Sequence, residues 1–172
     1  MFRKATKKDI DRISEIYDEI HDAEETGLVT IGWIRDIYPT RRTAETAVEV
    51  DDMFVEEVEG IVVAAARINK EQVPEYANAS WTADAPDDKV MVLHALVVSP
   101  KIKGKGYGTA FVDFYEKYAF ENGCPYLRMD TNARNSAARS LYKKLGYDEI
   151  SIVPCVFNGI DGVQLVCLEK NL

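Results

Sequence analysis

Three glycines and three lysines are concentrated in the segment from Lys101 to Gly108, which has the sequence KIKGKGYG. It follows an apolar run of strand composition, Val90 to Val98, and precedes a run with helical spacing. Glycine lets backbone N–H groups approach a bound oxyanion closely, and a helix start offers aligned donors at the positive end of its dipole. A strand, a glycine-rich turn and a helix start in this order predict a cradle for the phosphates of a ligand.

The spacing of the glycines distinguishes between the common phosphate-binding motifs. A Walker A loop needs Gly, four residues and then Gly-Lys-Ser or Gly-Lys-Thr, and the sequence lacks this order. The dinucleotide fingerprint GxGxxG needs glycine where Thr109 or Phe111 stands. The remaining pattern is a polar residue, two further residues, glycine, any residue, and then glycine or alanine. Residues 103–108, KGKGYG, match that pattern.

This match resembles the loop that binds the acetyl-CoA pyrophosphate in the GNAT superfamily of N-acetyltransferases, although Lys103 stands where that family usually has Arg or Gln. Residues 130–147, DTNARNSAARSLYKKLGY, resemble the family's second signature. That signature is a strand, an Asn, and a helix that ends in Leu-Tyr, two polar residues and Leu-Gly-aromatic. The two motifs are in the family's order. The resemblance covers roughly residues 50–170 by motif and residues 1–50 by element order alone.

The resemblance implies a mixed α/β (α+β) fold, the GNAT acyl-CoA N-acyltransferase fold, with helices on both faces of a central, mixed, twisted sheet. Two parallel strands, here Val90–Val98 and Tyr126–Asp130, splay apart, and acetyl-CoA enters the gap as cosubstrate. By this resemblance, the pantetheine arm is bound by the main chain of Leu96, Val97 and Val98 and by Asn135. The pyrophosphate is bound by the loop and the helix start that follow, which are Lys103, Gly104, Lys105, Gly106, Tyr107, Gly108 and Thr109.

The activity implied by the resemblance is transfer of an acetyl group to a primary amine, of a small molecule or of a peptide or protein, directly in a ternary complex. Tyr142 matches the tyrosine that protonates the departing CoA thiolate in this family. No cysteine is placed near the glycine loop in a way that suggests a covalent acyl-enzyme. The alternative is a non-catalytic acyl-CoA-binding or sensing module. Tyr142 and the titratable His94 favour the enzyme.

Three candidates for the general base are left open. His94 lies on the strand before the loop, where some aralkylamine acetyltransferases carry a catalytic histidine, and its ordinary pKa of about 6.5 suits proton abstraction. Asp130 occupies the position where ribosomal-protein N-terminal acetyltransferases place a glutamate, and its side chain is shorter. A chain of water molecules that involves neither residue is the third candidate.

Hydrophobic periodicity predicts the elements that must position these residues. Helices are expected over 10–25, over 42–50, from the glycines to Gly123, and from an Asn135 N-cap to Leu145. Residues 70–89 are polar, include Pro74 and Pro86, and are expected to form a long loop of the kind that is often functional. Strands are expected over 2–5, 53–58, 61–68, 90–98, 126–130, 147–157 and 162–168, the last two joined by a hairpin around Asn158-Gly159.

The composition bounds the class of protein. A chain of 172 residues with 47% hydrophobic content predicts one folded domain over residues 1–172. It contains no apolar run of membrane-spanning length, and a net charge of −8 argues against nucleic-acid binding. An odd number of cysteines without CxxC spacing, together with only two histidines, favours free thiols in the cytoplasm and no metal site. These residues are Cys124, Cys155, Cys167, His21 and His94.

The distribution of charge bears on the acceptor. Residues 1–60 carry 16 acidic and 8 basic side chains, whereas residues 61–172 carry 13 of each. This acidic surface is either only solvated or creates a field that favours a cationic amine acceptor such as a polyamine, an amino sugar or a lysine. A homodimer formed through the closing hairpin is left open. Four aromatic residues either line an acceptor pocket or, as the default, pack in the core: Trp33, Tyr38, Tyr76 and Trp81.

Overall fold

The computed structural model describes residues 1–102 and 104–172, so Lys103, predicted to bind the cofactor, lies outside the described residues. The described strands form one seven-stranded sheet in the order β1-β2-β3-β4-β5-β7-β6. Every neighbouring pair is antiparallel except β4 and β5, which are parallel, so the predicted mixed sheet is confirmed. The strands are β1 (Phe2–Lys4), β2 (Met53–Val58), β3 (Ile61–Asn69), β4 (Val90–Val98), β5 (Tyr126–Asn132), β6 (Asp148–Phe157) and β7 (Ile160–Asn171).

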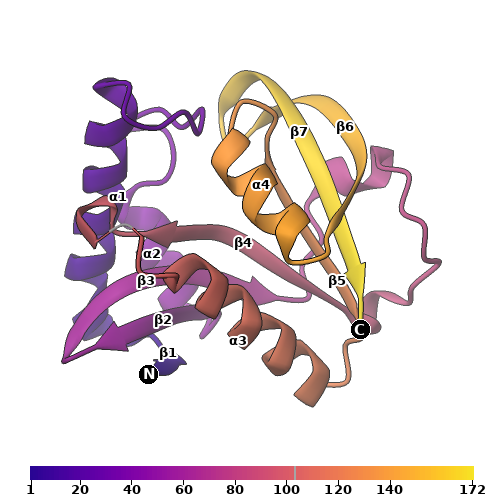
Figure 1. The fold of residues 1–172 in the computed structure, drawn as a ribbon, viewed down its shortest axis with the longest axis horizontal. Helices are drawn as coiled ribbons and strands as arrows, with labels where there is room; N and C mark the ends of the chain where they lie inside the picture. The colour runs from indigo at the N-terminus through magenta and orange to yellow at the C-terminus, as the bar shows by residue number, and fades with distance from the viewer. Residues whose placement is uncertain (103) are drawn as a thin grey trace.

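Helices cover both faces of this sheet, as predicted. The apolar stripes of α1 (Ile10–Glu25) and α2 (Arg41–Glu49) pack on one face of β2, β3 and β4. On the opposite face, α3 (Tyr107–Glu121) and α4 (Ser136–Lys144) cover a second core, to which Phe111, Tyr115 and Tyr142 belong. Figure 1 shows α1 on one side of the molecule and α4 beside the β6–β7 hairpin.

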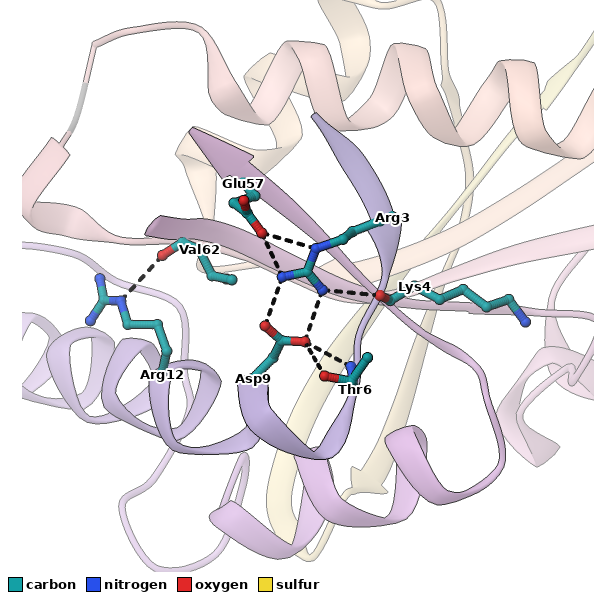
Figure 2. A network of polar contacts seen from close by, with 7 residues as sticks. All are labelled: Arg3, Lys4, Thr6, Asp9, Arg12, Glu57 and Val62. Carbon is teal, nitrogen blue, oxygen red and sulfur yellow. Dashed lines mark hydrogen bonds and ion pairs between the residues drawn. The ribbon is translucent and has the colours of Figure 1, made fainter. Parts of the chain in front are cut away.

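A cluster of polar contacts fixes the start of the chain (Figure 2). The Arg3 guanidinium donates to both carboxylate oxygens of Asp9 at 2.8 Å and to Glu57 Oε2 at 2.6 Å. The backbone N–H of Thr6 donates to Asp9 Oδ2 at 2.7 Å, which completes the predicted capping box before α1. We call Arg3, Thr6, Asp9 and Glu57 the N-terminal network. It ties β1, the start of α1 and β2 together.

Two expectations for the chain beyond residue 69 need correction. Residues 70–89 are not an irregular loop throughout, because they contain the 3-10 turns η2 (Pro74–Asn78) and η3 (Asp87–Lys89). The final strand begins at Ile160 rather than at residue 162. Asn158 and Gly159 both have positive φ, 50° and 77°, and this two-residue turn lets Phe157 pair directly with Ile160.

The two parallel strands separate partway along their length, as predicted. Their register pairs run from Val90 with Tyr126 only as far as Leu93 with Met129, although both strands continue. A β-bulge follows at Ala95, which has a φ of 51° and is the extra residue in β4 where its pairing with β3 shifts register. In Figure 1, β4 and β5 leave the same end of the sheet and diverge.

Candidate active site

A cavity of ≈ 660 Å³ lies where β4 and β5 diverge. Its walls come from the α1 and α2 side, from β4 and β5 past their last register pair, from residues 73–75, and from the β6–β7 turn. Seven residues predicted to act in catalysis or cofactor binding line it: His94, Leu96, Val97, Val98, Asp130, Asn135 and Tyr142.

The edge of β4 that faces this cavity has backbone groups without a partner strand. Val97 pairs with Ala65 of β3 on one edge of β4. On the other edge, no strand in the described chain pairs with β4 beyond Leu93. Leu96, Val97 and Val98 all line the cavity. Because backbone N–H and C=O groups need hydrogen-bond partners when buried, this edge fits an extended ligand that carries amides.

The glycine loop has the conformation that an anion cradle requires. Gly104 and Gly106 have φ angles of 81° and 77°, and a Cβ at either position would meet nothing within 4 Å. Ala110 N–H bonds to the Gly106 carbonyl at 2.9 Å, so the N–H groups before it in the first turn of α3 have no intrahelical partner. These groups, of Tyr107, Gly108 and Thr109, are available to phosphate oxygens.

The glycine loop does not line the cavity but lies at its end. Residues 104–109 are absent from the cavity walls. Gly108 is nevertheless close to the end of β4 and to α4, because a Cβ there would stand 3.3 Å from Leu141 Cδ2 and 4.0 Å from Val98 Cγ2. Lys105 is exposed. Gly108, predicted to contact the pyrophosphate, thus lies beside Val98, predicted to contact the pantetheine arm.

Asp130 lies at the start of the gap, immediately after the last register pair of β5. Because side chains alternate along a strand, it points to the face opposite Met129, which packs in the α3–α4 core. There the Tyr76 hydroxyl donates to Asp130 Oδ2 at 2.7 Å. Burial raises the pKa of the Asp130 carboxyl to about 6, against a smaller lowering by the Tyr76 hydrogen bond.

His94 occupies the equivalent place on β4 and is half-buried. Its Nε2 lies 3.0 Å from Asn69 Oδ1. Asn69 Oδ1 also accepts the Glu71 N–H, and Asn69 Nδ2 donates to Asp52, so this network assigns the proton to His94 Nε2. Burial and the nearby Arg67 charge lower the pKa of His94 to about 4. The imidazole is therefore neutral at physiological pH.

Tyr142 reaches the cavity from the opposite face of the sheet. It lies on α4, is 7% exposed and packs in the α3–α4 core. Its hydroxyl has no hydrogen-bond partner among residues 1–102 and 104–172. Burial, followed by the negative charge of Asp130, holds the pKa of Tyr142 above its ordinary value. The hydroxyl is therefore protonated at neutral pH, as a proton donor must be.

Asn135 and two of the four aromatic residues considered for the acceptor pocket lie at the cavity, and the other two lie in the core. The Asn135 side chain accepts the Ala138 N–H at 3.1 Å, which confirms the predicted N-cap, and its amide nitrogen remains as a donor at the cavity. Trp33 and Tyr38 line the cavity. Tyr76 and Trp81 instead pack together in the core beneath residues 70–89.

The acidic side chains of residues 1–60 do not form the walls of the cavity. None of these 16 side chains is among the described residues that line the walls. Several are neutralised on α1, where Arg35 alone pairs with Asp18, Asp22 and Glu25. The acidic residues that do line the cavity are Glu71, Glu75 and Asp130. The cationic acceptor expected from the charge of residues 1–60 stays a prediction, and the carboxylates at the cavity walls come from later in the chain.

The described part of the chain contains neither a candidate metal site nor a helix that could span a membrane. No group of three or more His, Cys, Asp or Glu side chains there is placed to hold a metal ion. Over the same residues, every helix is too short or too polar to cross a bilayer.

Sequence patterns missed the hydrogen-bond partners of both candidate bases. Asn69 contacts His94, which lies 25 residues away in the sequence, and Tyr76 contacts Asp130, which lies 54 residues away. Tyr76 carried a weak signal, as an aromatic residue inside a long polar segment. Asn69 carried none. The bulge at Ala95 also left no signal, because alanine rarely adopts positive φ.

The fold is that of an acetyltransferase family. The model of the acetyltransferase (GNAT) family matches residues 12–147, and the chain belongs to that family. It is 24% identical over 157 residues to an uncharacterized N-acetyltransferase of Methanocaldococcus jannaschii, a match that covers 88% of this chain. The match spans only 62% of the length of that relative.

Solved structures share the fold over the whole chain. A GNAT-family acetyltransferase from Streptococcus agalactiae superposes with a TM-score of 0.82 at 22% identity, and the match covers 100% of this chain and 95% of that one. A protein of Salmonella typhimurium described as an acetyltransferase, solved with its cofactor acetyl-CoA, superposes with a TM-score of 0.70 at 20% identity, covering 100% and 93%. These likenesses establish the GNAT fold.

Proposed function

We propose that this protein is an acetyl-CoA-dependent N-acetyltransferase that transfers the acetyl group directly to a primary amine in a ternary complex. The observation that carries the proposal is the gap between β4 and β5. A phosphate cradle lies at its end, an unpaired strand edge runs along it, and Asp130 and Tyr142 enter it from opposite faces of the sheet. Family membership and the acetyl-CoA bound to the Salmonella protein support the choice of cofactor.

The residues of the gap fit acetyl-CoA, which supplies a thioester as the acyl donor. The first N–H groups of α3 and the loop around Gly104 and Gly106 would hold the pyrophosphate. The main chain of residues 96–98 and the Asn135 amide would bond the pantetheine arm. A backbone N–H on the unpaired edge of β4 would stabilise the oxyanion that develops on the acyl carbonyl.

Asp130 is the base in this proposal. A protonated alkylamine must lose a proton before it can attack, and a base works best when its pKa is near the operating pH. The Asp130 carboxyl, with a pKa of about 6, meets that condition. His94, with a pKa of about 4, is a weaker base, and because its Nε2–H is donated to Asn69, only its Nδ1 could accept a proton. Tyr142 then gives its hydroxyl proton to the departing thiolate.

The acceptor in this proposal carries a positive charge beyond the reacting amine. Arg67 is compensated by Glu71 at 2.6 Å and by Asp52 at 3.3 Å. Glu75 lines the cavity without an ion-pair partner among the described residues, and its negative charge acts on Asp130. We therefore expect the KM for diamines to rise with salt and to rise further in Glu75→Gln, whereas the KM for a neutral-tailed amine changes little. A preference for acidic acceptors would exclude this specificity.

A thiol-release assay tests the function. Purified protein is mixed with acetyl-CoA and a panel of diamines, amino sugars, lysine peptides and acidic amines, and free CoA is measured with and without acceptor. The expected result is acceptor-dependent release of CoA together with a product one acetyl group heavier by mass spectrometry. Calorimetric titration with CoA is the control for folding and binding. Tight CoA binding without acceptor-dependent release across the panel would favour the non-catalytic binding module.

A further inference from the structure

Residues 70–89, which we call the strap, are braced against the sheet by buried polar contacts. Arg128 on β5 is buried, donates to the side chain of Gln72, and donates to the Ala83 carbonyl at 3.2 Å. Its guanidinium also lies over the Trp81 ring, 4.2 Å from the centroid. Charged groups are rarely buried unless they are paired and hydrogen-bonded, so Arg128 fixes the path of the strap at several points.

A second set of contacts braces the other part of the strap. Glu169 on β7 is buried and accepts hydrogen bonds from both the backbone N–H and the hydroxyl of Thr82. The Ser80 N–H donates to the Ser151 hydroxyl of β6 at 2.7 Å. Together with Arg128, these groups attach the strap to three neighbouring strands. Because so many side-chain hydrogen bonds hold it, this polar segment is an integral part of the fold.

The anchored strap delivers one hydroxyl to the active site. Tyr76, at 3% exposure, is held by edge-to-face contact with Trp81, whose Nε1–H donates to the Tyr76 carbonyl at 2.9 Å. The Tyr76 hydroxyl donates to Asp130 Oδ2. Asp130 lines the cavity, and its Oδ1 has no hydrogen-bond donor among the described residues. The strap therefore occupies one carboxylate oxygen of Asp130 and leaves the other for a further partner.

We infer that Tyr76 is a positioning residue for the reaction: its hydroxyl, held in place by the strap, orients the Asp130 carboxylate and keeps it ionised so that Oδ1 can take the proton of the acceptor amine. This inference rests on the proposed function. A hydrogen bond to the charged form of a carboxyl lowers its pKa, which counteracts the effect of burial. Besides Tyr76, the titratable groups that interact electrostatically with Asp130 are Glu75 in η2, Tyr142 in α4, Tyr38 before α2, and Cys155 and Cys167 in β6 and β7. His94 in β4 and Arg67 in β3 line the same cavity.

The kinetic test compares Tyr76→Phe with Tyr126→Phe. Tyr126 is packed against the same core and also loses only a hydroxyl, but no hydrogen bond joins it to Asp130. In Tyr76→Phe we expect the acidic limb of the kcat/KM profile to move up by about one pH unit. At pH 6.5 turnover should fall several-fold while the affinity for CoA is unchanged. Tyr126→Phe should retain the wild-type limb. An unmoved limb in Tyr76→Phe would overturn the inference.

A direct titration separates this inference from the proposed function. The Asp130 carboxyl carbon is followed by NMR as pH is varied, in the wild-type protein and in Tyr76→Phe, without substrate. The pKa of Asp130 should be higher in the variant. Replacement of Tyr76 by 3,5-difluorotyrosine, a stronger donor of the same shape that guards against a folding defect, should shift that pKa downward. Equal values in all three proteins would overturn the role of Tyr76, whether or not the enzyme is active.

Discussion

The N-terminal network and the active site each centre on an aspartate, and the pKa values of the two carboxyls are shifted in opposite directions. Hydrogen bonds from Arg3, followed by those from Thr6, lower the pKa of Asp9 to about 2 (Figure 2). Burial raises the pKa of Asp130 to about 6, and a single neutral hydroxyl is its donor. The residue type is the same in both places. The number and charge of the donors differ.

This difference separates a structural carboxylate from a reactive one. Asp9 has its lone pairs occupied by charged and backbone donors, so its negative charge stabilises the folded chain and cannot readily accept a proton. Asp130 has one oxygen without a donor among the described residues, and it lines the cavity. The negative charge of Asp130 therefore lowers the stability of the folded protein, and the raised pKa makes the carboxylate a stronger base. The largest expected effects on activity therefore belong to Asp130 and its neighbours, and the largest losses of stability belong to the network.

The largest effect is expected for Asp130→Asn. Removing a general base lowers the rate by about 100-fold or more, so kcat/KM for the best amine should fall by that factor at pH 7. The affinity for CoA should stay within about twofold, because no cofactor contact is proposed for Asp130. Asp9→Asn is the matched variant, with the same chemical change at a distance from the cavity, and should retain the turnover of the folded enzyme. Loss of activity in both variants to a similar degree would contradict the comparison.

Tyr142→Phe is expected to slow turnover at least about tenfold. The substitution removes the hydroxyl from a buried side chain while keeping its packing in the α3–α4 core. Binding of CoA, measured by calorimetry, should be unchanged. The loss should be smaller with an acyl donor whose thiol leaving group is more acidic, since such a thiolate departs without a proton. Equal slowing with both donors would argue against proton donation by Tyr142.

The same two aspartates should have opposite effects on stability. The Asp9 carboxyl has a pKa of about 2 against an ordinary 3.8, so its contribution is present above pH 4 and is lost as the pH falls toward 2. Asp9→Asn should lower the free energy of unfolding by about 2 kcal/mol at pH 7. The pKa of Asp130 is raised from an ordinary 3.8 to about 6, so the fold loses stability as the pH rises between these two values, and Asp130→Asn should raise the free energy of unfolding by about 3 kcal/mol at pH 8.

Urea denaturation at several pH values measures both effects. At pH 3 the wild-type Asp130 carboxyl is protonated in the folded and unfolded chain, so the gain from Asp130→Asn should vanish there. The loss from Asp9→Asn should shrink as well, because at pH 3 the Asp9 carboxyl is also mostly protonated in the unfolded chain. If Asp130→Asn destabilised the protein at pH 8, burial could not be the cause of the raised pKa.

The sequence predicted the parts of the site that are local in the chain. The glycine loop and the helix that carries Tyr142 are contiguous patterns whose spacing reflects local geometry, so both were found, as were the capping box at Thr6 and the hairpin turn at Asn158-Gly159. The contact between Tyr76 and Asp130 depends on the path of the strap over β5 and β7, and no local pattern encodes it. The pKa shifts depend on burial, which exists only after packing.

The smallest effect is expected for His94→Gln, which sharpens the choice between the two bases. Gln can donate to Asn69 as the imidazole Nε2–H does, so the local hydrogen bond is retained. Because His94, with a pKa of about 4, is neutral and weakly basic at pH 7, kcat/KM should fall no more than about threefold. The acidic limb near pH 6 should remain, since it belongs to Asp130. If the limb disappeared in His94→Gln and persisted in the residual activity of Asp130→Asn, His94 would be the base and the strap would serve another purpose.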